Sequence, residues 1–121
     1  MAKVFVEKEG NSRLRLANNT ARTVAKDDFV ILGGISGVAL EETRAGFVGA
    51  FHVEEGLVLQ IGQADFATGA SFAWNAPVFY LPDGTFSNTG AAGAFLVGQV
   101  TEQLASGVVR FAKYFRAYPV T

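Results

Sequence analysis

The sequence of 121 residues contains no cysteine, a single histidine and only three prolines. Without cysteine the chain has no disulfide scaffold, no thiolate zinc site and no cysteine nucleophile. The lone histidine, His52, excludes any site that needs two imidazoles. No apolar run approaches the ~20 residues with which a helix crosses a bilayer, and the first residues lack the apolar centre of a signal peptide. We therefore expect a protein with no membrane association.

Charge is also scarce, since charged residues make up 17% of the chain against roughly 25% in an average soluble domain. Phenylalanine is abundant, with 11 residues. Few charges and many phenylalanines in one small domain predict apolar side chains on its surface, and a contiguous apolar patch usually marks a protein–protein contact. An oligomer or a subunit of an assembly is favoured over the alternative, an unusually apolar monomer.

The charges that are present follow a pattern along the chain. Residues 1–28 carry a net charge of +2, residues 29–109 carry −6, and residues 110–121 carry +3. A nucleic-acid module normally shows a strongly basic face, because phosphate neutralisation supplies most of its affinity. An acidic middle with mildly basic ends suits contacts between protein subunits better. No direct nucleic-acid partner is predicted.

Short β-type runs, separated by glycine, asparagine, aspartate and proline, dominate the sequence. The expected strands are 3–6, 13–17, 29–32, 35–40, 46–53, 57–61, 71–74, 77–81, 94–101 and 108–115. Pro82-Asp83-Gly84-Thr85 is a strong hairpin turn, and 100–106 is interpreted as a loop or one short turn. The pattern predicts an all-β fold: one compact barrel-like or sandwich-like domain of short antiparallel strands, residues 13–121, after a loose N-terminal arm, residues 1–12.

No motif predicts catalysis, a cofactor or a metal. His52 has no nucleophile elbow to serve and is expected at the surface or in an interface. Gly33-Gly34-Ile35-Ser36-Gly37 lacks the Lys-Ser/Thr end of a phosphate-binding loop and is interpreted as a turn. The adjacent acidic pairs are poor chelators, because neighbours in a strand point to opposite faces. Trp74 is expected to pack in the core. We predict no catalytic, cofactor-binding or metal-binding residue.

An ordered set of weak glycine-, valine- and alanine-rich motifs spans nearly the whole chain. The motifs are Lys26–Gly34, Gly37–Leu40, Arg44–Gly49, Val53–Leu59, Thr68–Trp74, Gly98–Val100 and Gly107–Phe111. In this order and spacing they resemble the small capsid cement, or head-decoration, proteins of tailed bacteriophages and prophages. The chain departs from that family in continuing through an aromatic and basic tail, residues 114–121.

The resemblance implies a non-enzymatic structural protein of the virion. Such a protein is made in the cytoplasm of the bacterial host and binds the outside of the expanded head, commonly as a trimer at threefold positions. Its partner is the major capsid protein, whose neighbouring subunits it bridges, and it needs no cofactor. The family's N-terminal arm is thought to order against the shell, and by position the matching residues, expected at a capsid or subunit interface, are Lys3, Val4, Phe5, Arg13 and Arg15.

Two alternatives stay open at the level of sequence. The first is another phage interaction component, such as a tail or spike protein, built on the same fold. The second is a β-barrel that binds a small ligand or oligosaccharide around Trp74 and His52, which predicts an open pocket containing both side chains.

Overall fold

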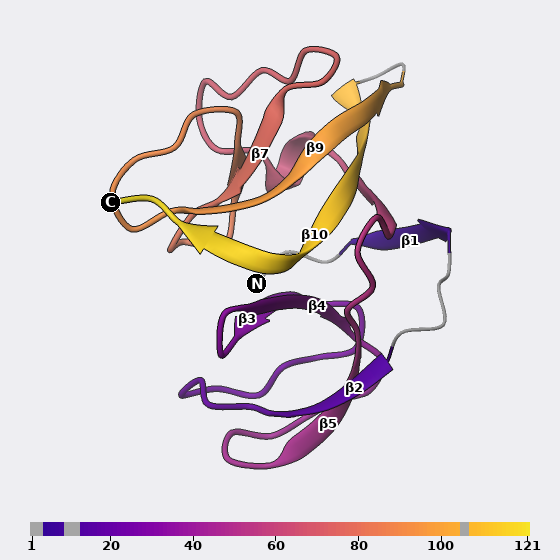
Figure 1. The fold of residues 1–121 in the computed structure, drawn as a ribbon, viewed down its shortest axis with the longest axis vertical. Coiled ribbons are helices and arrows are strands. Elements are labelled where there is room, and N and C mark those ends of the chain that lie inside the picture. Colours follow the sequence, from indigo (N-terminus) through magenta and orange to yellow (C-terminus); the bar gives the residue numbers. More distant parts are fainter. Residues whose placement is uncertain (1–3, 9–12, 105–106) are drawn as a thin grey trace.

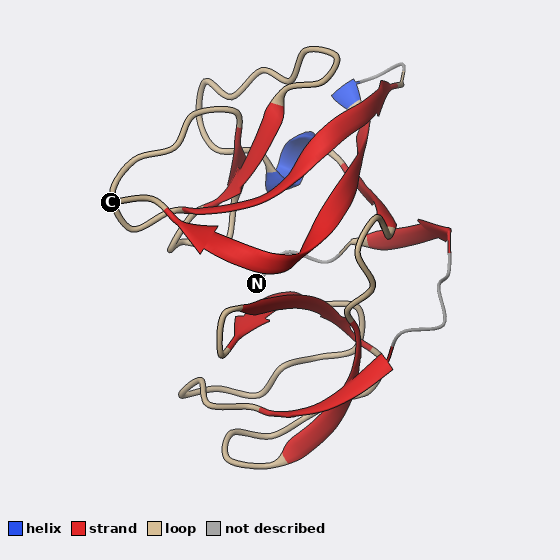
Figure 2. Ribbon diagram, viewed as in Figure 1, coloured by secondary structure: helices blue, strands red, loops and turns tan. Residues whose placement is uncertain are grey.

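The computed structural model describes residues 4–8, 13–104 and 107–121. Within these ranges the chain forms ten strands and one short 3-10 turn, η1 (Gln63–Asp65), and every pair of strands is antiparallel (Figure 2). The strands are β1 (Phe5–Lys8), β2 (Arg13–Ala17), β3 (Phe29–Leu32), β4 (Ile35–Ala39), β5 (Val48–His52), β6 (Val58–Ile61), β7 (Pro77–Tyr80), β8 (Phe86–Ser87), β9 (Phe95–Gln103) and β10 (Val109–Pro119). The all-β prediction is confirmed.

The strands divide into two lobes, each with its own hydrophobic core (Figure 1). We call β2 to β5 the first lobe and β1 with β6 to β10 the second lobe. The main path of strand pairing runs β2-β5-β4-β10-β9-β7-β8, while β3 joins β4, β6 joins β10 and β1 joins β6. The lobes therefore share one hydrogen-bonded sheet system, with β4 and β10 at the junction.

Strand β3 explains the uninterrupted apolar run in the sequence. Phe29 and Ile31 pack in the core of the second lobe, whereas Val30 and Leu32 pack in the core of the first. Alternate side chains of a strand point to opposite faces, so a strand between two cores needs apolar residues at every position. This strand places one wall of the first lobe directly against the second.

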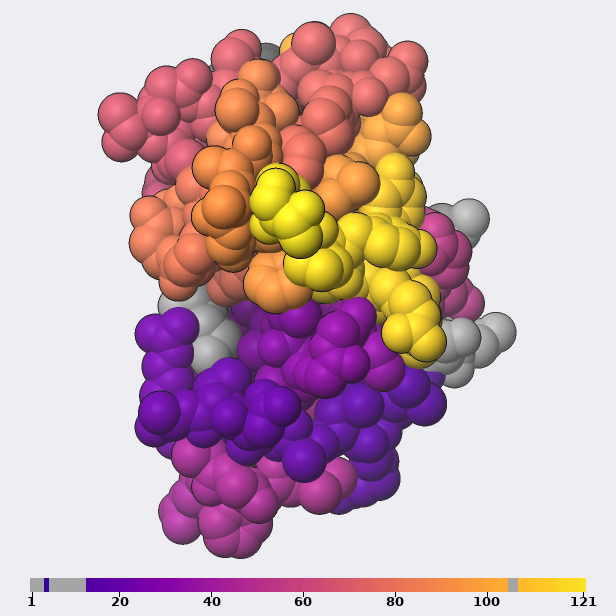
Figure 3. All heavy atoms as spheres, turned by 60° about the vertical axis from the view of Figure 1, so that its left-hand side comes forward, coloured from indigo at the N-terminus to yellow at the C-terminus, as the bar shows by residue number. Residues whose placement is uncertain are grey.

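Strand β10 ties the lobes together. Its first half pairs with β9 and β6, and then Arg116 pairs with Ile35 of β4. The Ser36 hydroxyl donates a hydrogen bond of 2.7 Å to the Tyr114 carbonyl, and the Ala117 amide donates one of 2.9 Å to the Gly34 carbonyl. Figure 3 shows the C-terminal residues, in yellow, lying against the indigo and purple residues of the first lobe.

Most of the expected strands are confirmed, and the Pro82–Thr85 turn closes the β7–β8 hairpin with Gly84 at a φ of 87°. Residues 71–74, however, are a loop and not a strand, and β9 continues to Gln103, through the segment interpreted as a loop or turn. Ser71-Phe72-Ala73-Trp74 has β-type composition, but no neighbouring strand pairs with it. Composition alone does not supply a pairing partner.

The burial of two side chains is the opposite of what the sequence predicts. Trp74, expected in the core, is 60% exposed because it lies in the 71–76 loop. His52, expected at the surface or in an interface, is only 3% exposed. It pairs with Arg13 on one side and Val38 on the other, so β5 is an interior strand at this point. Both predictions are wrong for the same reason, since strand order is invisible in local sequence.

The expected N-terminal arm is described only in part, because residues 1–3 and 9–12 lie outside the described ranges. Val4 is 3% exposed, belongs to the core of the second lobe, and donates its amide hydrogen to the Asp27 carbonyl at 3.1 Å. The strand β1 that follows pairs with β6. This section of the arm is thus packed onto the second lobe.

Candidate functional site

The structure spreads the predicted interface residues over different environments. Lys3 lies outside the described residues, and Val4 is buried in the core. Phe5 opens strand β1, where its backbone is opposite Gln60. Arg13 and Arg15 are both exposed on β2, in the first lobe. Of the five, these two arginines are the ones that the structure presents as a pair on the surface.

Strand β2 is an edge of the sheet, since its only partner in the described part of the chain is β5. Its alternation is regular: Leu16 packs against the core of the first lobe, whereas Arg13 and Arg15 point to the opposite face. An edge strand offers unpaired backbone N–H and C=O groups, which another chain can use by adding a strand. Two arginines beside such an edge favour an acidic partner.

A hollow of about 370 Å³ adjoins this edge, and charged side chains of both signs surround it together with two apolar ones. It is lined by Arg15, Glu41, Glu42, Thr43, Arg44, Phe47 and Val48. Phe47 is 62% exposed and Val48 51% exposed. Phe47 and Val48 form an apolar corner, the clearest exposed apolar feature of the first lobe.

Backbone hydrogen bonds fix this corner in place. The Asn18 amide donates to the Phe47 carbonyl at 2.8 Å, and the Gly46 amide donates to the Asn18 carbonyl at the same distance. Gly46 has a φ of 84°, a conformation that glycine adopts without steric cost. The sequence analysis did not predict this corner. The available signal is the position of Phe47 directly after an Ala-Gly turn, where an aromatic side chain can be exposed.

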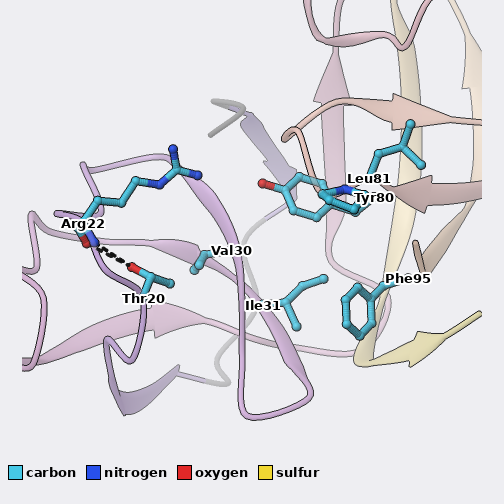
Figure 4. Close-up of a pocket in the computed structure, with 8 residues that line it drawn as sticks. Thr20, Arg22, Val30, Ile31, Tyr80, Leu81 and Phe95 are labelled. Carbon is cyan, nitrogen blue, oxygen red and sulfur yellow. Dashed lines mark hydrogen bonds between the residues drawn. The ribbon is translucent and has the colours of Figure 1, made fainter. Parts of the chain in front are cut away.

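A second hollow, of about 180 Å³, lies between the lobes (Figure 4). We call it the interlobe groove. Its lining is mainly apolar and comes from the loop after β2, from β3, from the end of β7 and the following turn, and from the start of β9. The lining residues are Thr20, Arg22, Val30, Ile31, Tyr80, Leu81, Pro82 and Phe95. These positions are too far apart in sequence for any local motif to connect them.

Lys113 is the most unusual ionisable group of the described chain, because its side chain is fully buried. Its Nζ donates hydrogen bonds to the carbonyl oxygens of Val53, at 2.9 Å, and Glu54, at 3.3 Å. Burial lowers the pKa of Lys113 to about 8, against a smaller opposing effect of the nearby Glu55 and Glu54 carboxylates. The residue joins β10 to the turn between β5 and β6, which is a structural role.

The structure assembles no metal site from the residues that it describes. Among the described residues, no group of three or more histidine, aspartate or glutamate side chains could hold a metal ion. None of three hollows, a third of about 320 Å³ near Gln63 and Gln103 included, is lined by His52 or Trp74. His52 is buried in the first lobe and Trp74 is exposed on a loop of the second, so these three hollows do not support the ligand-binding alternative. In the described ranges, no helix has the length and apolar character needed to cross a membrane.

Comparison with models of protein families identifies one matching family. The family model described as phage cement protein matches residues 8–113, which run from the end of β1 to the middle of β10 and include both lobes. The chain belongs to the phage cement protein family. No curated protein and no solved structure matches the chain.

Membership of the phage cement protein family gives the chain a capsid-stabilising structural role. The protein is non-enzymatic, binds the capsid and belongs to the virion. The resemblance seen in the sequence is thereby confirmed. In a cement protein, the surfaces that contact other proteins take the place of an active site, which directs attention to the β2 edge, the Phe47–Val48 corner and the interlobe groove.

Proposed function

We propose that this cement protein binds the outside of the expanded phage head as a trimer at threefold positions, and that the β2 edge is its principal contact with the major capsid protein. Family membership supports the capsid-stabilising role. The single observation that carries the choice of surface is the exposed edge of β2, with Arg13 and Arg15 beside the Phe47–Val48 corner.

The β2 edge combines two sources of affinity. Strand addition supplies main-chain hydrogen bonds and needs little side-chain specificity, while burying exposed apolar surface contributes about 25 cal/mol for each Å² removed from water. Val48 lies opposite Ala17 in the β2–β5 ladder, so the apolar corner directly continues the edge strand. A partner segment could cover both at once.

Trimer formation fits a protein that folds as a compact unit before it assembles. The accessible surface is 6334 Å², close to the ~6,300 Å² typical of a compact monomer of this mass. A trimer would add avidity, because several moderate contacts made at once hold far better than one.

The edge is tested by reversing its charge. Purified expanded heads that lack the protein are incubated with wild type or with the double variant Arg13→Glu/Arg15→Glu, and bound protein is measured after sedimentation. The matched control is Arg116→Glu, which reverses an exposed charge on β10. We expect the double variant to lose about tenfold or more in affinity and the control to bind like wild type. Equal binding by all three would contradict the assignment of the edge.

The trimer is tested separately by sedimentation equilibrium, with a mass near three times 12.8 kDa expected. A clean monomer at high concentration, both free in solution and when released from heads, would contradict it. Heads that are fully stable without the protein but fail to adsorb to bacteria would instead favour the tail or spike alternative.

A further inference from the structure

The interlobe groove has the form of a preformed receptor for one bulky side chain. Ile31 and Phe95 form its lower part in Figure 4, with Leu81 and the ring of Tyr80 opposite the Thr20–Arg22 loop. The volume of the groove, about 180 Å³, is several times the ~30 Å³ that one water molecule occupies in the liquid. Apolar walls around such a space favour an apolar occupant over water.

The rim of the groove supplies one positive charge. Arg22 is exposed, and none of the ion pairs seen among the described residues involves its guanidinium group. Figure 4 shows the Tyr80 hydroxyl directed toward Arg22 across the hollow. That hydroxyl donates a long hydrogen bond of 3.4 Å to the Phe29 carbonyl, and burial raises the pKa of Tyr80, so it stays protonated at neutral pH. Among the charged groups that act on this hydroxyl, Arg22 has a larger effect than Asp28 or Asp83, and it alone of the three lines the groove, so its side of the rim suits a carboxylate.

The groove needs little reorganisation to accept a ligand. The two lobes that form its walls are joined by β10 through the Ser36–Tyr114 and Ala117–Gly34 hydrogen bonds. The Glu55 carboxylate also accepts a hydrogen bond of 2.7 Å from the Phe115 amide. A rigid, preformed site loses less conformational entropy on binding than a mobile one.

The C-terminal residues of a second copy are poor occupants, because backbone hydrogen bonds hold them on their own lobe. The Val120 amide donates to the Ala94 carbonyl at 2.9 Å, and the Val120 carbonyl accepts from the Gly93 amide at 3.4 Å.

We propose that the interlobe groove binds an extended acidic segment of the major capsid protein, with one bulky apolar side chain in the hollow and a neighbouring carboxylate on Arg22. The inference rests on the proposed function and adds a second contact to it. Charge complementarity selects the occupant, because Arg22 is the one charged residue among the described residues that line the groove, whose other lining side chains are apolar or carry a hydroxyl. The Thr20–Arg22 loop directly follows β2, so one capsid subunit could engage both surfaces.

The contact is tested with three variants on purified expanded heads that lack the cement protein. Arg22→Gln removes the charge, Arg22→Glu reverses it, and Ile31→Phe fills the hollow. The matched control is Arg116→Gln, an exposed arginine on β10 that lines neither the groove nor the hollow beside the β2 edge. We expect Arg22→Gln to bind about tenfold more weakly, as for the loss of a hydrogen bond to a charged group, and Arg22→Glu more weakly still.

Arg22→Gln should fold like wild type, because the hydrogen bonds that hold this loop at Arg22 use its backbone. The Arg22 carbonyl accepts from the side-chain amide of Asn18 and from the Thr20 hydroxyl. Circular dichroism and thermal melting of Arg22→Gln should match wild type. Wild-type affinity for Arg22→Gln and Ile31→Phe together would overturn the proposal.

A photo-crosslinking residue, benzoylphenylalanine, in place of Leu81 identifies the occupant directly. We expect a crosslink to a capsid peptide that contains a bulky apolar residue next to an aspartate or glutamate. A crosslink to a second copy of the cement protein, or none on saturated heads, would overturn the groove assignment. These failures differ from failure of the proposed function, in which wild-type protein would not bind heads at all.

Discussion

Replacing the buried Lys113 with methionine should change how stability depends on pH. The variant Lys113→Met keeps the length and apolar stem of the side chain but removes the ammonium group, which donates to the Val53 and Glu54 carbonyls. Because the side chain is buried, solvent and salt screen the change only weakly. The expected effect can therefore be calculated from the pKa.

The folded-state pKa of Lys113 is about 8, lower than the ordinary value of 10.5. A lowered lysine pKa means that the folded protein disfavours the charged form. The resulting cost is complete below about pH 8 and disappears as the pH rises toward 10.5. At 1.36 kcal/mol per pKa unit, the cost is at most about 3 kcal/mol, so this residue makes wild type gain stability between these two pH values.

Lys113→Met loses this gain and also leaves two carbonyl groups without their donor, at about 1–3 kcal/mol each. Near pH 7 the relief from burying a charge offsets much of that loss. Near pH 10.5 only the loss remains, so the variant should be about 3 kcal/mol worse relative to wild type than at pH 7.

Urea unfolding of both proteins at a series of pH values between 7 and 10.5 measures the difference. Arg116→Met is the matched control, since it removes an exposed cation from the same strand, and its offset from wild type should not vary with pH. A constant difference between Lys113→Met and wild type across this range would refute the assigned pKa and its cause.

Three further predictions concern stability and are read from thermal or urea unfolding. Gly98→Ala should destabilise the fold by more than 1 kcal/mol, because an added Cβ would lie 2.5 Å from the Ala112 carbonyl oxygen. The control Gly62→Ala, which has open space around the added Cβ, should leave stability unchanged. Equal effects of the two substitutions would contradict the packing at β9. Asn18→Ala should cost about 2–3 kcal/mol, since its fully buried amide group donates to two backbone carbonyls at 2.9 Å, and a loss below 0.5 kcal/mol would contradict it. Arg110→Gln should cost less than about 1 kcal/mol, because its 3.4 Å contact with Glu102 and its 3.3 Å hydrogen bond to Gln60 are both at partly exposed positions, and a larger loss would contradict this expectation.

The strand pattern and the turns were predictable from the sequence, because they depend on local chemistry. Strict alternation gave β2 with its correct bounds, and the Pro-Asp-Gly-Thr turn located the β7–β8 hairpin. Phe29–Leu32 was predicted as a strand from its apolar run, but the reason for that run, a position between two cores, depends on the tertiary fold.

The two lobes and the surfaces they form could not be predicted from the sequence. His52 is buried on a strand that has neighbours on both sides at that point, and Trp74 is exposed on a loop that pairs with no strand, and neither placement follows from local sequence. The interlobe groove brings Arg22 close to Tyr80, and no periodicity relates residues so far apart in the chain. Lys113 follows the inward alternation of Val109 and Phe111, which is a signal for its burial that composition alone hides.

The most direct test of the account is to add the purified protein to expanded heads that lack it, and to measure both bound copies and the temperature at which the packaged DNA escapes. A capsid-stabilising cement protein should bind to saturation and raise that temperature, and the double variant Arg13→Glu/Arg15→Glu should do neither at the same concentration. Heads that bind wild-type protein but release their DNA at an unchanged temperature would contradict the central claim.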